Sequence, residues 1–99
     1  MAPPEICFLF NTRSNSGLSL RRERSIREQV EQRWPGAEFI LTEPENRFWD
    51  SLTEQLAGVT TIVACGGDGT VHKAGNLAIR LNATLGVIPI GSGNDFAHM

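Results

Sequence analysis

The stretch from Val59 to Thr70, VTTIVACGGDGT, decides the fold of this chain. Its first seven residues form an apolar run of the kind that makes a buried strand. The strand passes directly into a turn with three glycines, and Thr70 is then a suitable cap for a helix that we expect to continue to about Leu81. The sequence therefore predicts a buried strand, a tight glycine turn and a helix in direct succession.

The same alternation continues on both sides of this unit. Ile6 to Phe10 is an unbroken apolar run, which favours a parallel strand covered on both faces. We expect strands over 5–11, 37–42, 59–65 and 84–90, and helices over about 19–34, 46–57 and 70–81. The inward stripes predicted for these helices are Ile26, Val30 and Trp34; Phe48 or Trp49, Leu52 and Leu56; and Val71, Ala74, Ala78 and Leu81. Helices between successive strands imply right-handed crossovers, so the predicted fold class is α/β, a Rossmann-like three-layer domain with a parallel sheet in the order β-α-β-α-β-α-β.

Composition restricts the function classes. The 99 residues suffice for one small domain, and 40% hydrophobic with 20% charged content is typical of a soluble globular protein. A net charge of -2 gives no general attraction to nucleic acid. The longest apolar run is too short to span a bilayer. Cys7 and Cys65 fall in predicted strands, where free cysteine is a small buried hydrophobe, and we expect a cytosolic protein.

A second glycine segment, Gly91 to Phe96 (GSGNDF), follows the last predicted strand. Parallel sheets bind ligands beyond the carboxyl ends of their strands, where both glycine segments lie. Glycine lets successive N–H groups point at a phosphate, and an isolated aspartate suits Mg²⁺ contact or proton abstraction. The P-loop pattern is absent, and Gly67-x-Gly69 continues to His72, so the dinucleotide fingerprint fails as well. The sequence predicts a nucleotide site of another kind.

These segments resemble a known superfamily. The string GGDGT at Gly66–Thr70 is shared by diacylglycerol kinases, sphingosine kinases, NAD kinases and, with variation, 6-phosphofructokinases. The continuation Thr70–His72 and the later segment Pro89–Ala97 look specifically like the diacylglycerol kinase catalytic domain, the lipid-kinase branch. The resemblance extends from Phe8 to Met99.

The resemblance implies a role for each matching position. Asp68 would be the general base for a lipid hydroxyl or would reach Mg²⁺ through water, and Asp95 would assist a hydrogen-bond or metal network. The residues implied to hold ATP are Asn11, Ser16, Gly17, Gly66, Gly67, Gly69, Thr70, Gly91, Ser92, Gly93, Asn94 and Asp95.

Three positions depart from the family pattern. The family usually has proline where Thr12 stands and commonly has glutamate where Lys73 stands, which reverses a charge near the nucleotide. Ser92 in place of the usual threonine keeps the hydroxyl.

The resemblance implies an ATP-dependent lipid kinase that uses Mg²⁺. It also implies that residues 1–99 are the N-terminal part of the catalytic domain, inactive alone, without the second, β-rich domain. The acceptor lipid stays open among diacylglycerol, a sphingoid base and an isoprenoid alcohol, and so does the oligomeric state. We expect a cytoplasmic protein with peripheral contact at the inner membrane surface and no nucleic acid partner. The alternatives are an NAD kinase, whose family lacks the second glycine segment, and a non-catalytic nucleotide-binding module.

Overall fold

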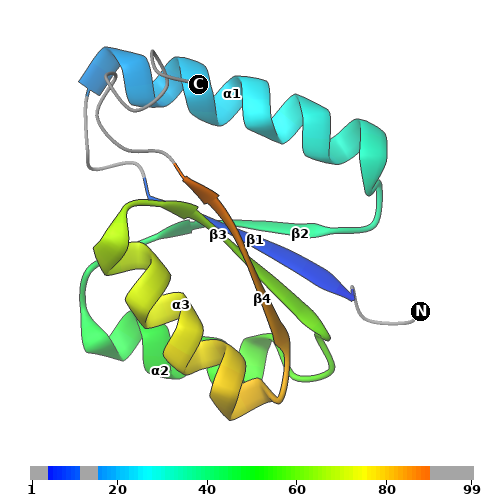
Figure 1. Cartoon of the computed structure of the whole chain (residues 1–99), viewed down its shortest axis with the longest axis vertical. Helices are drawn as coiled ribbons and strands as arrows, with labels where there is room; N and C mark the ends of the chain where they lie inside the picture. Colours follow the sequence, from blue (N-terminus) through cyan, green and yellow to red (C-terminus); the bar gives the residue numbers. More distant parts are fainter. Residues whose placement is uncertain (1–4, 12–15, 90–99) are drawn as a thin grey trace.

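The computed structural model describes residues 5–11 and 16–89, and it shows strands and helices in strict alternation (Figure 1). The elements are β1 (Ile6–Asn11), α1 (Ser16–Arg33), β2 (Glu38–Thr42), α2 (Asn46–Gln55), β3 (Thr61–Gly66), α3 (Asp68–Leu81) and β4 (Thr84–Pro89). The predicted order of elements is confirmed.

The four strands form one parallel sheet in the order β2-β1-β3-β4. Leu9 pairs with Ile40 on one side and with Ala64 on the other, so β1 is a central strand. Helix α1 covers one face of the sheet, and α2 and α3 cover the other (Figure 1). This is the three-layer α/β architecture that the sequence predicts.

Strand β1 is buried from both sides, which explains its unbroken apolar run. Cys7 and Leu9 belong to a core cluster that includes Trp49, Leu52 and Ala74 of α2 and α3. The intervening residues, Phe8 and Phe10, belong to a second cluster with Val30 of α1. Because successive side chains of a strand point to opposite faces, one continuous apolar segment supplies the centre of both clusters.

Helix ends differ from the predicted ones. Helix α1 begins at Ser16, three residues before the predicted start, because polar residues are as compatible with the first turn of a helix as with a loop. Helix α2 ends at Gln55, and the chain then reverses through Gly58, whose φ of 97° is accessible to glycine. At the same edge of the sheet α3 stops at Leu81, because Asn82 takes the left-handed conformation.

Two side-chain predictions are wrong. Thr70 does not cap α3, because the helix starts at Asp68 and Gly67 takes the cap position with extended backbone. Trp34 does not complete the inward stripe of α1: it lies just after the helix and is 42% exposed, although its ring packs at 5.4 Å from that of Phe8. In the described residues, no helix combines the length and apolarity that crossing a bilayer requires.

Candidate functional site

The turn between β3 and α3 is a single residue long, since β3 ends at Gly66 and α3 begins at Asp68. The first intrahelical bond of this turn runs from the Val71 N–H to the Gly67 carbonyl, at 3.0 Å. The N–H groups of Asp68, Gly69 and Thr70 therefore have no acceptor within the helix. They lie at the positive end of the α3 dipole, at the carboxyl edge of the sheet.

The glycines of this turn differ in what surrounds them. A Cβ on Gly66 would lie 2.9 Å from Thr70 Oγ1, closer than real Cβ atoms come, and 3.0 Å from Thr70 Cβ, which is tighter than most real Cβ contacts. At Gly67 and Gly69 a Cβ would meet no heavy atom of the described chain within 4 Å. Gly67 has a φ of -92°, which any residue adopts, and Gly69 is helical. Steric crowding by Thr70 therefore explains why residue 66 is glycine. No such crowding explains the glycines at 67 and 69.

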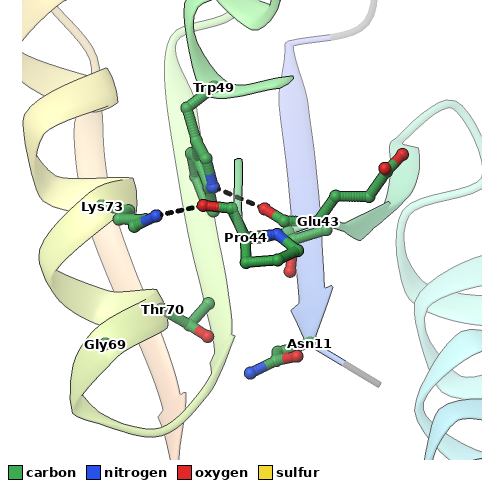
Figure 2. A pocket seen from close by; sticks show the side chains of 8 residues that line it. Asn11, Glu43, Pro44, Trp49, Gly69, Thr70 and Lys73 are labelled. Atoms are coloured by element: carbon green, nitrogen blue, oxygen red, sulfur yellow. Dashed lines mark hydrogen bonds between the residues drawn. The ribbon is translucent and has the colours of Figure 1, made fainter. Parts of the chain in front are cut away.

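A pocket of about 390 Å³ lies beside the first turn of α3, against the carboxyl ends of β1 and β2. Figure 2 shows the residues that surround it, with Thr70 and Asn11 extending toward each other at one end. Its lining residues are Asn11, Thr42, Glu43, Pro44, Trp49, Gly69, Thr70 and Lys73.

The loop between β2 and α2 forms one wall of this pocket and is held from two helices. The indole Nε1–H of Trp49 donates to the Glu43 carbonyl at 2.8 Å, and Lys73 Nζ donates to the Pro44 carbonyl at 2.6 Å (Figure 2). At the end of β2 the Thr42 hydroxyl, nearly buried, donates to the Phe10 carbonyl of β1 at 3.5 Å. The wall is therefore tied to the sheet and to both helices on that face.

The structure brings only some of the predicted site residues to the pocket. Asn11, Gly69 and Thr70 line it, while Gly66, Gly67 and Asp68 form the adjoining turn. Ser16 and Gly17 are the first two residues of α1. The predicted contacts at Gly91, Ser92, Gly93, Asn94 and Asp95 lie outside the described residues.

Sequence reasoning missed the contribution of β2 and its loop. Thr42, Glu43, Pro44 and Trp49 line the pocket without having been predicted there, whereas Lys73 was expected near the nucleotide. The signal was available, because the rule that placed the glycine segments at the carboxyl edge applies equally to the end of β2. No glycine follows that strand, so the sequence marks no ligand loop there.

One acidic residue lies in the turn that adjoins the pocket. Asp68 is exposed in the first turn of α3. Among the described residues, no three His, Cys, Asp or Glu side chains gather into a metal-binding group. Mg²⁺ commonly keeps several waters and binds one or two carboxylates together with substrate phosphates. The described residues therefore present one exposed carboxylate, Asp68, in the first turn of α3.

Residues 5–99 match the diacylglycerol kinase catalytic domain. A probable lipid kinase YegS of Escherichia fergusonii is 30% identical over 91 residues, which cover 88% of this chain and 28% of that protein. A probable lipid kinase YegS-like protein of Xanthomonas axonopodis pv. citri is 32% identical over 111 residues, covering 98% of this chain and 33% of the relative. The chain spans about a third of the length of these relatives.

Proposed function

Because this chain belongs to the diacylglycerol kinase catalytic domain family, we propose that it forms the nucleotide-binding part of an ATP-dependent lipid kinase. The reaction would move the terminal phosphoryl group of ATP to the hydroxyl of a diacylglycerol-like lipid. The observation that carries the proposal lies at the start of α3, where a Cβ on Gly67 or Gly69 would meet no other described residue within 4 Å. Glycine at those positions allows an external phosphate to approach the backbone closely.

The proposed phosphate contacts come from backbone rather than side chains. The N–H groups of the first turn of α3 have no acceptor within the helix, and together with the helix dipole they favour an anion at this end of the helix. Phosphoryl transfer depends mainly on positioning and on neutralising charge, which such donors supply. The Thr70 hydroxyl, at the pocket wall, is proposed to add one contact.

The carboxylate of Asp68 is proposed to act on the acceptor. It is exposed in the same turn and can accept the proton of a lipid hydroxyl, a contribution worth roughly 10²–10⁴-fold in rate. Magnesium is proposed to enter with ATP, bound to its phosphates and reached by Asp68 through water. Asp95 is proposed to join that network.

The remaining nucleotide contacts are proposed from two other parts of the chain. Asn11 lines the pocket, and Ser16, the first residue of α1, lies five residues later in the chain and is followed by Gly17. The segment from Gly91 to Asp95 follows β4, and its backbone and side chains are proposed to flank the nucleotide.

The lipid site is proposed to require residues that correspond to the rest of the relatives, including a β-rich second domain. The matched relatives are about three times as long as this chain, so we expect no turnover from these 99 residues alone. Peripheral contact with the inner membrane surface belongs to the same proposal, because the acceptor is a lipid. Measurable lipid phosphorylation by this chain alone would contradict the proposal that the lipid site requires further residues.

The Asp68→Asn variant tests the proposed function in the complete kinase. Asparagine keeps the shape of the side chain and removes the base, so turnover should fall by about 10²-fold or more while affinity for Mg²⁺–ATP stays within a few fold. Asp50→Asn is the matched control, because Asp50 is an exposed carboxylate of α2 paired with Arg80. Near-normal turnover in Asp68→Asn would refute the assignment.

A further inference from the structure

Lys73 is the only lysine of the chain, and the proposed function gives it no role. It lies on the second turn of α3 and donates from Nζ to the carbonyl of Pro44 at 2.6 Å. Hydrogen bonds from a charged donor are short and stronger than neutral ones. Proline has no N–H, so this carbonyl is the one backbone group through which Pro44 can be held.

The neighbouring carbonyl is held in the same way from the other helix. Trp49 of α2 donates to Glu43 at 2.8 Å, so two consecutive carbonyls of the β2–α2 loop are bound by donors from α2 and α3 (Figure 2). These two side chains also line a second cavity, of about 360 Å³, between α2 and α3. Lys73 and Trp49 thus separate the pocket from this second cavity.

We infer that Lys73 is a positioning residue that fixes the β2–α2 loop as a rigid wall of the nucleotide pocket. This inference rests on the proposed function for the identity of the ligand. The hydrogen bonds that hold the wall are present without any ligand. A wall fixed in advance contributes equally to the ground state and the transition state, so its loss weakens nucleotide binding and leaves the chemical step unchanged. An ionised glutamate at position 73 cannot donate to Pro44 and would repel its carbonyl oxygen.

Arg80 offers a matched control on the same helix. It lies seven residues after Lys73, two turns along, and its Nη1 is 3.0 Å from Asp50 Oδ1 in an exposed ion pair. Arg80→Met therefore removes one positive charge from α3, as Lys73→Met does, without touching the loop.

The first readout needs no ligand. The chain has two tryptophans, so its ¹⁵N-labelled form gives two indole N–H signals, which Trp34→Phe assigns. Loss of the Lys73 bond should loosen the loop and speed hydrogen exchange of the Trp49 indole by about three- to tenfold, the range expected for one hydrogen bond. Lys73→Arg should restore slow exchange, and Arg80→Met should leave it unchanged. Unchanged exchange in Lys73→Met would overturn the inference.

The second readout is the affinity for Mg²⁺–ATP, measured by calorimetry. Lys73→Met should raise the Kd by about three- to tenfold and Lys73→Glu should raise it more, while in the complete kinase kcat stays within about twofold. Equal Kd values for Lys73→Met and the unaltered chain would overturn the positioning role. Absence of Mg²⁺–ATP binding by the unaltered chain would instead contradict the proposed function, and the indole exchange would still decide whether Lys73 holds the wall.

Discussion

At the scale of single residues, packing requires the glycine at position 66, but it does not require the one at position 69. Gly66→Ala puts a Cβ against the buried side chain of Thr70, so we expect it to lower the free energy of unfolding by about 1–3 kcal/mol. Gly69→Ala adds a methyl group in open space within a helix, which should leave stability unchanged or raise it by about 0.5–1 kcal/mol. Urea unfolding of both variants measures the difference.

The Gly69→Ala variant also tests whether this glycine serves nucleotide binding. If Gly69 serves close approach of a phosphate, Gly69→Ala should weaken Mg²⁺–ATP binding while the fold stays intact. Undiminished binding by a stable Gly69→Ala chain would show that the open space at this glycine has no part in binding.

The two thiols predict how stability depends on pH. Burial raises the pKa of both Cys7 and Cys65 from 9.0 to about 12, and the nearby Glu38 carboxylate adds to the shift at Cys7. Between these values the unfolded chain loses thiol protons that the folded chain keeps. The stabilisation is therefore complete below pH 9 and is lost as pH rises toward 12, at about 1.4 kcal/mol per pH unit for each thiol.

Urea unfolding at pH 8 and pH 10 under reducing conditions measures this loss. The chain has no tyrosine and a single lysine, so few other side chains titrate in that interval. The double variant Cys7→Ala, Cys65→Ala should show a flatter dependence. An equally steep decline in the double variant would assign the effect to other groups.

At the scale of elements, α2 depends on a few buried side chains. It is short, and Leu52 is 1% exposed within the cluster formed with β1, β3 and α3. We expect Leu52→Ala to lower the free energy of unfolding by about 2–5 kcal/mol, since it removes buried methyl groups and leaves a cavity. The exposed Ser51→Ala is the control and should change stability by about 0.5 kcal/mol or less. Thermal unfolding followed by circular dichroism distinguishes the two.

The existence of every element could be predicted from the sequence, but the ends of the helices could not. A strand buried on both faces needs apolar residues at every position, as from Ile6 to Phe10. Such a run can be recognised directly in the sequence. The start of a helix is harder to predict, because several neighbouring polar residues are about equally suitable as the first helical residue. At α3 the threonine that looks like a cap is used instead for packing against Gly66, a contact that only the three-dimensional arrangement creates.

At the scale of the whole molecule, the order of strands determines the site. The sequence predicts that the ends of β1 and β3 face a common ligand, and Asn11, Gly69 and Thr70 do line one pocket. It does not predict that β2 lies next to β1, and it therefore does not place Thr42 or the loop after it at the pocket. Sheet order is decided by packing among elements distant in sequence, and the bond from Lys73 to Pro44, 29 residues apart, is a consequence of that packing.

A titration of the ¹⁵N-labelled chain with Mg²⁺–ATP tests whether a nucleotide binds at the carboxyl edge of this sheet. We expect saturable amide shifts at Asn11, at Thr42 and in the segment from Gly67 to Thr70. Absence of shifts in a well-dispersed spectrum would contradict it. So would shifts confined to the opposite edge, where β2, β3 and β4 begin at Glu38, Thr61 and Thr84.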